Sequence, residues 1–277
     1  MFTSNVMEAL NFLAAPLLMC LILVGIHCYL GIHVLARGVI FVDLALAQVA
    51  ALGATVPFFF FHEPSSLVKY LFSLGFTLGA AAFLTLSNRF RQTLSQEAVI
   101  GVLFAFCSAS LIVLADQMPH GSEHLKHSMI GQLLWTTWAD VLKVFIIYSG
   151  VSGLYYIFRK PLLANSLGIA SLWSMDFLFY ALFAVVITSS VQVAGILIVF
   201  SFLIVPALLS AVFFKDVAKR LWFGWGIGAI LSVFGMFGSY YWNLPSGAFI
   251  VGVFTCVPLL LILVKAIFLN KANAQRE

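Results

Sequence analysis

Long apolar runs alternate with short polar turns along most of this chain. Each run is rich in Leu, Ile, Phe, Val, Ala and Gly. Most approach the roughly 20 residues that a helix needs to cross the hydrocarbon core of a bilayer. The alternating pattern of barrel strands is absent. The pattern therefore predicts an all-α fold, a polytopic transmembrane helical bundle of nine spans, with eight as the alternative, at residues 9–32, 41–61, 66–87, 98–115, 133–158, 177–190, 194–214, 221–242 and 244–268.

Composition agrees with this class. Hydrophobic residues make up 63% of the 277 residues, charged residues only 9%, and the mean hydropathy is +1.10. No stretch is long and polar enough for a separate soluble domain, so residues 1–277 are expected to form one transmembrane domain. The sequence has no glycine-rich phosphate-binding loop followed by Lys and Ser or Thr, and no HExxH set. We therefore expect a chain that is not an enzyme, with any ATP hydrolysis carried out by a partner.

The basic residues predict an orientation. The formal net charge is +4, but in a membrane protein the position of the charges matters more than their sum. Alternating the loops collects most Lys and Arg on one side, which is then cytoplasmic. The N-terminus is expected outside, the C-terminus inside, and no nucleic acid is expected as a partner. The residues on the predicted cytoplasmic side are Arg37, Arg89, Arg91, Arg159, Lys160, Lys215, Lys219, Arg220, Lys265, Lys271 and Arg276.

Ionisable and polar residues within the first two spans are candidates for a transport pathway. Asp43 and Gln48 lie in the second span, and charge in hydrocarbon costs several kcal/mol by most estimates, so such a residue is a functional hypothesis by default. Their spacing puts them about 140° apart around a helix, which suits a broad pore-lining face rather than one tight ligand face. His27 and His33 either bond neighbouring helices or act as ligands. Arg37 is either an interfacial anchor or functional.

An outer loop carries three histidines. His120, His124 and His127 follow the spacing four then three, which stacks them on one helical face. Histidine is a common ligand for zinc and related metals, so one interpretation of the three is a transient site on the periplasmic side where a divalent metal first binds. The other interpretation, which the local sequence favours, is a solvated loop. Pro119 and Gly121 argue against a continuous helix through His120.

Two segments are expected at the cytoplasmic surface. The stretch from 161 to 176 is amphipathic and too polar to cross the membrane. Pro206 is expected to end or kink a helix, after which residues 206–220 would form a short helix with an apolar face and a basic tail. Such a helix suits a groove on a soluble partner or, alternatively, the lipid interface. Its candidate contact residues are Pro206, Phe213, Phe214, Lys215 and Asp216.

Several stretches together resemble the permease subunits of bacterial ABC importers for zinc, manganese and iron(II). They occur in the family's order over almost the whole chain, and that order is more specific than any one motif. The resemblance implies a dimeric permease in the bacterial cytoplasmic membrane, a periplasmic or lipoprotein metal-binding protein and a cytoplasmic ABC ATPase. It also implies that the segment after Pro206 couples to this ATPase. The stretches are HVLARGVIFVDLALAQVAALG, SQEAVIGVLFA, IGQLLW, LANSLGI, VAGILIVFSFLIVPALL and LPSGAFIV.

The chain departs from the family's pattern at one place. The family usually has Asp and His four residues apart on the second helix, and the matching positions here are Leu44 and Gln48. Asp43 lies one place early. Either Asp43, Gln48 and a histidine such as His27 or His33 rebuild the site, or the cargo is chelated. No permanently bound cofactor is expected, because the metal is the cargo. The alternatives are a permease for a metal chelate, siderophore, heme or vitamin, and an ATP-independent carrier.

Overall fold

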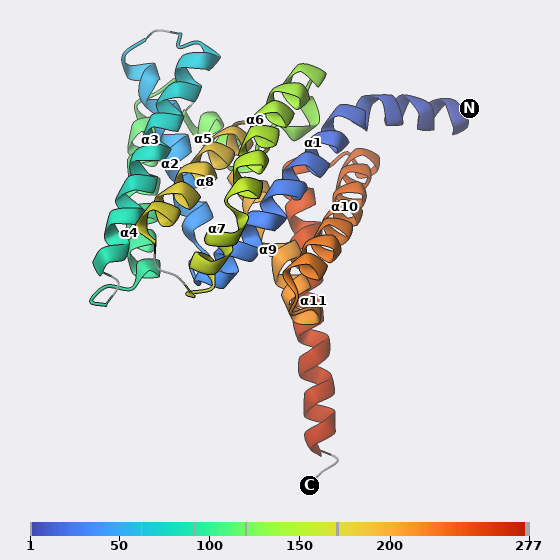
Figure 1. The fold of residues 1–277 in the computed structure, drawn as a ribbon. Coiled ribbons are helices and arrows are strands. Elements are labelled where there is room, and N and C mark those ends of the chain that lie inside the picture. Colours follow the sequence, from blue (N-terminus) through green and yellow to red (C-terminus); the bar gives the residue numbers. More distant parts are fainter. Residues whose placement is uncertain (1, 62, 91, 120, 170–171, 275–277) are drawn as a thin grey trace.

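The fold is built from helices alone in the residues that the structure describes. The computed structural model describes residues 2–61, 63–90, 92–119, 121–169 and 172–274, and side chains are considered for residues 11–265 of these ranges. The predicted all-α fold is confirmed (Figure 1). The elements are α1 Phe2–Arg37, α2 Val42–Thr55, η1 Val56–Phe59, α3 Ser66–Ser87, η2 Asn88–Phe90, α4 Gln96–Asp116, α5 Gly121–Ile130, η3 Leu133–Trp135, α6 Trp138–Ile157, α7 Arg159–Ser166, α8 Trp173–Ala194, α9 Ile196–Phe213, α10 Val217–Trp242 and α11 Ser246–Ala274.

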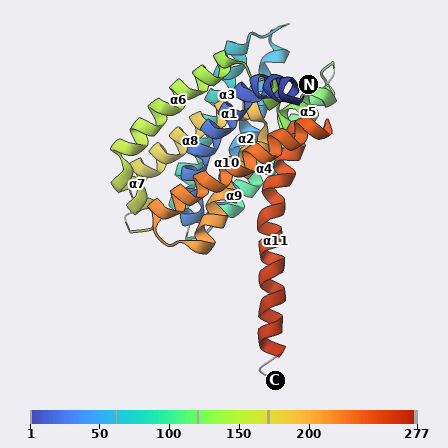
Figure 2. The same cartoon turned by 90° about the vertical axis from the view of Figure 1, so that its right-hand side faces the viewer.

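Nine helical segments of the described chain are long and apolar enough to cross a membrane. This confirms the larger of the two predicted counts. The start of α1 and the end of α11 lie at opposite ends of the bundle, as an odd number of crossings requires (Figures 1 and 2). The second half of α11 extends away from the other helices in both views.

Local hydrogen bonds explain where several spans begin. The fifth span was predicted from residue 133, but α6 begins at Trp138 because Thr137 and Asp140 form a reciprocal capping box. Ser95 caps α4 by accepting a hydrogen bond from the Ala98 amide, as expected of a helix start. The sixth span was predicted from residue 177, yet α8 begins at Trp173 and includes Asp176. Part of the predicted surface stretch therefore belongs to a membrane helix.

The prediction of a separate short helix from residue 206 to 220 is wrong. Pro206 lies buried inside α9, which continues to Phe213, and α10 begins at Val217. Membrane helices tolerate proline when neighbouring helices pack around it. Gly228 of α10 packs against the Pro206 ring, where an added Cβ would lie 3.4 Å from the ring and would clash first with Val24 of α1. Only a short connection separates α9 from α10.

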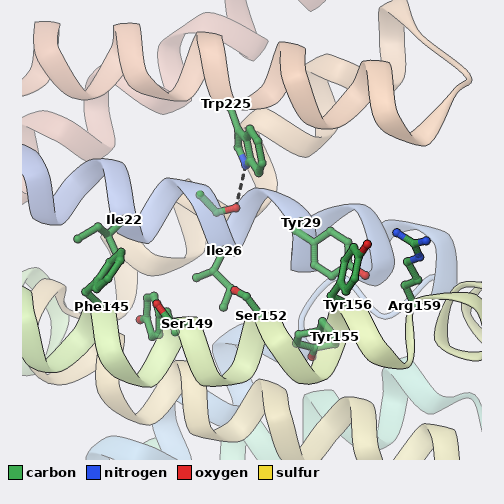
Figure 3. A pocket seen from close by; sticks show the side chains of 12 residues that line it. Ile22, Ile26, Tyr29, Phe145, Ser149, Ser152, Tyr155, Tyr156, Arg159 and Trp225 are labelled. Carbon is green, nitrogen blue, oxygen red and sulfur yellow. Dashed lines mark hydrogen bonds between the residues drawn. The ribbon is translucent and has the colours of Figure 1, made fainter.

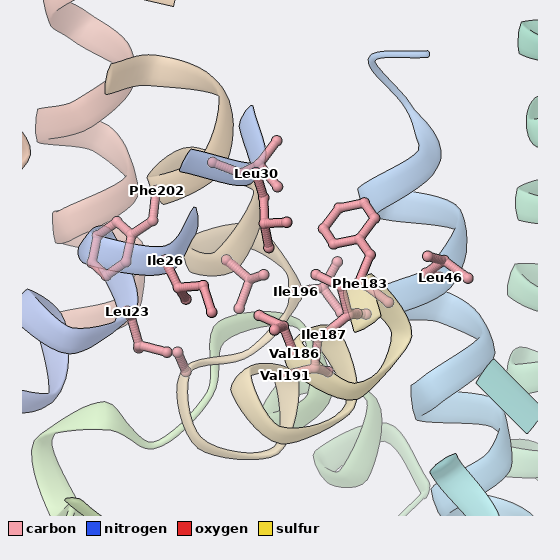
Figure 4. Packing of buried hydrophobic residues seen from close by; sticks show 14 of the residues in the cluster. Leu23, Ile26, Leu30, Leu46, Phe183, Val186, Ile187, Val191, Ile196 and Phe202 are labelled. Carbon is pink, nitrogen blue, oxygen red and sulfur yellow. The ribbon is translucent and has the colours of Figure 1, made fainter. Parts of the chain in front are cut away.

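The core lies among α1, α2, α8 and α9. In each of these helices, between 61% and 72% of the residues in the apolar 18-residue stretch are buried, against 17% to 33% in the other spans. Figure 4 shows side chains of the four helices interdigitating, among them Leu30, Leu46, Phe183 and Phe202. Because lipid provides no hydrophobic driving force between helices, close packing must hold them together. The alanine-rich α2 suits that central position.

Three of the stretches that carry the family resemblance meet at one end of the bundle. Gly131, Gly195 and Gly247 come from IGQLLW, VAGILIVFSFLIVPALL and LPSGAFIV. A side chain at Gly131 would clash with the backbone of Ala194, and one at Gly247 with the backbone of Ile130. Gly131 and Gly195 also have positive φ angles of 70° and 78°, which favour glycine. Close backbone contact therefore explains these glycines without any role in binding cargo.

Candidate functional site

Asp43 lies in the first turn of α2 and is completely buried. A carboxylate near a helix N-terminus is favoured by the helix dipole. Nevertheless, both carboxylate oxygens lack a hydrogen-bond partner among the described residues, and so does Oε1 of the buried Gln48. Buried polar atoms are nearly always paired, and each exception needs a physical explanation. These oxygens are available to a cation or to a donor group of a cargo.

A row of alanines connects Asp43 to a pocket at the other end of α2. Asp43, Ala47, Ala50 and Ala54 are spaced four, three and four positions apart, so they share one helical face. Ala50 and Ala54 line a pocket of about 370 Å³. At about 1.5 Å per residue, Asp43 lies about 10 Å along the helix from Ala50. Small side chains thus separate the pocket from the buried carboxylate.

The pocket is formed by four helices and is rich in polar groups. Helices α2, α3, α5 and α8 contribute to it, and its lining residues are Ala50, Ala51, Ala54, Ser66, Lys69, Ser73, His124, His127, Ser128, Gln132, Val191 and Gln192. Gln48 precedes Ala51 by three positions and therefore lies one turn from the lining on the same side of α2. The hydroxyl, amide and imidazole groups offer lone pairs to a cation, whereas the ammonium group of Lys69 in the same lining opposes one.

Two of the three predicted histidines lie in this pocket. Residues 121–130 form α5, so His124 and His127 share a face as their spacing predicted, whereas His120 lies outside the described residues. The Nε2 atom of His124 is 3.2 Å from the Thr55 hydroxyl. Burial first, and then the charges of Lys69 and His127, lower the pKa of His124 below its ordinary value. A neutral imidazole keeps a lone pair free for a metal.

The other two histidines make hydrogen bonds within the bundle. His27 Nδ1 is 2.7 Å from the Leu23 carbonyl, and its Nε2 is 3.2 Å from the Ser190 hydroxyl. His33 Nδ1 is 2.9 Å from the hydroxyl of Ser166. Within the ranges described above, no three His, Cys, Asp or Glu side chains form a group that could hold a metal. His27 and His33 are therefore not gathered with Asp43 into one ligand set.

The structure also reveals a buried polar network that the sequence analysis missed. Asp176 accepts hydrogen bonds from Arg37 at 2.6 Å, from Asn88 at 2.7 Å and from Asn165 at 2.7 Å. The Arg37 Nε also donates to Ser166, and its guanidinium lies 4.1 Å from the centre of the Phe179 ring. One carboxylate thus joins α1, η2, α7 and α8. The isolated Arg37 and the polar LANSLGI stretch were the features of the sequence that hinted at this network, but neither indicates that Asp176 is the common partner.

Four of the predicted coupling residues, Phe213, Phe214, Lys215 and Asp216, lie around the connection between α9 and α10, whereas Pro206 is buried inside α9 and does not reach this surface. The Phe213 ring is 54% exposed and packs with Phe214 against Phe223, with ring centroids 5.5 Å and 5.4 Å away. Lys215 is exposed. Asp216 has a structural task, because it caps α10 by accepting a hydrogen bond from the Lys219 amide at 3.0 Å. The connection therefore presents an aromatic ring and a cation beside a well-ordered helix start.

Known proteins resemble the chain over most of its length. A family model described as "ABC 3 transport family" matches residues 9–265. The chain is 28% identical over 209 residues to the manganese transport system membrane protein MntC of Listeria innocua, covering 70% of this chain and 74% of that protein. It is 26% identical over 212 residues to the chelated iron transport system membrane protein YfeC of Yersinia pestis, covering 71% of each.

A solved structure has the same fold. A chain of PsaBC from Streptococcus pneumoniae in complex with Fab matches with a TM-score of 0.76 and 19% identity, covering 93% of this chain and 94% of that one. At that identity the likeness concerns the arrangement of the helices alone.

Proposed function

This chain belongs to the ABC 3 transport family, and we therefore propose that it is the transmembrane permease subunit of an ATP-driven importer for divalent metal ions. Relatives named for manganese and iron transport support those two ions as cargo, and zinc is the third candidate. The chain does not hydrolyse ATP in this proposal. A cytoplasmic ABC ATPase supplies the energy, and a periplasmic or lipoprotein metal-binding protein delivers the metal.

The unpartnered oxygens of Asp43 carry the proposal for the pathway. A metal released outside meets His124 and His127 in the polar pocket, passes the alanine face of α2 and reaches Asp43, with Gln48 beside the route. Oxygen ligands suit manganese and iron, and imidazole suits iron and zinc. The small side chains between pocket and carboxylate keep the route closed in this state. Two copies of the chain open it by alternating access as the ATPase binds and hydrolyses ATP.

The same residues support a second candidate cargo. Gln48 stands where the family usually has a histidine ligand, and the described part of the chain gathers no three-ligand metal group. A metal chelate requires fewer protein ligands, because the chelator already occupies coordination positions of the metal. A permease for a metal chelate is therefore the alternative, and Asp43 and Gln48 would then contact the chelator.

Uptake into proteoliposomes distinguishes these cargoes. The complete transporter, with ATPase and binding protein, is supplied with manganese, iron(II) or zinc ions and with ATP. We expect ATP-dependent accumulation of at least one ion, and we expect Asp43→Asn to reduce it by at least about tenfold, because metal affinity is highly sensitive to the ligand shells. Asp116→Asn changes an exposed acid at the end of α4 and serves as the matched control. Gln48→Ala is compared with Gln117→Ala in the same way.

The outcomes distinguish the two kinds of cargo and test the pathway residues. No uptake of any free ion, with ATP hydrolysis intact, would favour the chelate. Unchanged uptake in both Asp43→Asn and Gln48→Ala would remove these residues from the pathway.

The proposed ATPase contact is tested separately. We expect Phe213→Asp to prevent copurification of the ATPase, because a carboxylate on an exposed aromatic contact opposes docking. Phe60→Asp is the matched control, since Phe60 is 73% exposed and follows η1, at the opposite end of the bundle from the α9 to α10 connection. Copurification of the Phe213→Asp permease with ATPase at the wild-type ratio would contradict the assignment.

A further inference from the structure

A second cavity, of about 500 Å³, lies apart from the proposed pathway. It opens between α6 and α10, and α1 forms its floor (Figure 3). Trp225 of α10 lies over α1 and donates a hydrogen bond of 2.8 Å from its indole to the Gly25 carbonyl. Ile22, Ile26 and Phe145 give the cavity apolar walls, and neither carboxylates nor histidines line it. Its chemistry therefore suits a hydrocarbon chain better than a metal ion.

One end of this cavity is basic. Arg159 lines it at the junction of α6 and α7, and its guanidinium lies 4.4 Å from the centre of the Tyr156 ring. Arg159 is exposed, and among the described residues no carboxylate lies within ion-pair distance of it. Lys160 follows it directly. Trp222 of α10 is 72% exposed and stands edge-on to Trp225, which lines the cavity. Exposed tryptophans are typical of the membrane interface.

The length of the cavity matches one leaflet. Phe145 of α6 and Arg159, the first residue of α7, lie at its two ends, fourteen positions apart (Figure 3). At about 1.5 Å per residue this is about 21 Å, against about 15 Å for half of a bilayer's hydrocarbon core. The remaining length reaches the headgroup layer, where Arg159 lies. The hydroxyl of Tyr156 lies near this basic end and can meet the polar part of a lipid, whereas Ser152 lies midway along the cavity.

We propose that this cavity binds an anionic phospholipid of the leaflet on the Arg159 side. The acyl chain lies along α1 between α6 and α10, and the phosphate contacts the guanidinium of Arg159. Arginine suits a phosphate because its planar donors match the phosphate oxygens. Complementary charge selects an anionic lipid over a zwitterionic one, since lipid-facing basic residues are attracted to the negative surface potential of anionic lipids. The bound lipid fills the groove and supports α1, the helix that carries Arg37.

Native mass spectrometry of the complete transporter tests this site. The transporter is equilibrated with vesicles of equal parts phosphatidylglycerol and phosphatidylcholine, and the lipids retained after extraction are counted. We expect phosphatidylglycerol to be retained preferentially. Arg159→Gln should lower its retention about fivefold, the effect expected of one basic residue near an anionic surface. Arg89→Gln is the matched control, because Arg89 is also exposed and lies over an aromatic ring, that of Trp173.

A second pair of variants tests the acyl chain. Ser152→Phe fills the cavity and should lower retention of phosphatidylglycerol, whereas Gly153→Phe adds a ring on the same helix outside it, where a side chain meets open space. Equal retention of the two lipids by the wild-type protein would overturn the proposal, as would unchanged retention in Arg159→Gln. If Ser152→Phe instead dissociates a permease dimer without changing lipid retention, a second copy covers the groove and the proposal is wrong.

Discussion

Asp176 offers the sharpest test of the energetics of this fold. The side chains of Asp176 and Arg37 are only 10% and 8% exposed, and the nearest carboxylate and guanidinium atoms are 2.6 Å apart. Asp176→Ala would leave the arginine buried without a counter-charge, which costs about 3–5 kcal/mol. Asn88 and Asn165 would each lose an acceptor, at about 1 kcal/mol apiece. These terms sum to about 5–7 kcal/mol, so we expect a loss of at least about 5 kcal/mol in the free energy of unfolding.

Thermal denaturation of the purified permease in detergent measures this loss. For a chain of this size, about 5 kcal/mol corresponds to a fall in the midpoint on the order of 10 °C. Asp216→Asn is the control, because Asn caps a helix about as well as Asp and the residue is exposed. Its midpoint should stay within about 2 °C of the wild type.

A double mutant separates the network from ordinary packing. Arg37→Met in the Asp176→Ala background removes the uncompensated charge, so the double mutant should be more stable than Asp176→Ala alone. A fall of only one or two degrees in Asp176→Ala, or strictly additive losses in the double mutant, would refute the view that this network is a tightly coupled buried unit.

Three further predictions follow from local geometry. Gly131→Ala should destabilise the protein by about 1–3 kcal/mol, because the φ of Gly131 is 70° and the new side chain would clash with the Ala194 backbone. In the same denaturation assay, Gly153→Ala should be neutral or slightly stabilising, because a side chain there meets open space. The pKa of His124 is lowered in the folded chain, so the unfolded chain takes up a proton there at a higher pH than the folded chain. The free energy of unfolding therefore falls as the pH drops below about 6.5. His124→Gln should remove part of that fall between pH 7.5 and 5.5. Ser95→Ala should cost about 1 kcal/mol through loss of the α4 cap, and Ser95→Asp should not.

Several features of the fold were predictable because they depend on local sequence. The nine spans follow from apolar run lengths, since every backbone polar group in lipid must be satisfied within its own helix. The cap at Ser95 and the shared face of His124 and His127 follow from residue type and helical period. The course of the chain around Pro206 was mispredicted, because local rules say that proline ends a helix and do not include the helices that pack around it.

The candidate site was only partly predictable for the same reason. Asp43 and Gln48 stood out because polar residues are rare in apolar spans, but their lack of partners depends on which helices surround α2. The pocket required α5 to fold back over α2 and α3. The sequence offered Arg37 as either an anchor or a functional residue, and its contact with Asp176 spans 139 positions of the chain.

By itself, the sequence determined the class of the protein, limited the number of its spans to nine or eight and identified the polar residues of interest, because hydropathy and helical periodicity act over one or two turns. Only the tertiary structure decided which polar groups are paired and which are left open. A carboxylate such as Asp176 is satisfied by donors from three other elements, while neither carboxylate oxygen of Asp43 has a hydrogen-bond partner among the described residues. Pairing is a property of distance in space, and no local pattern in the sequence encodes the distance between residues on different helices.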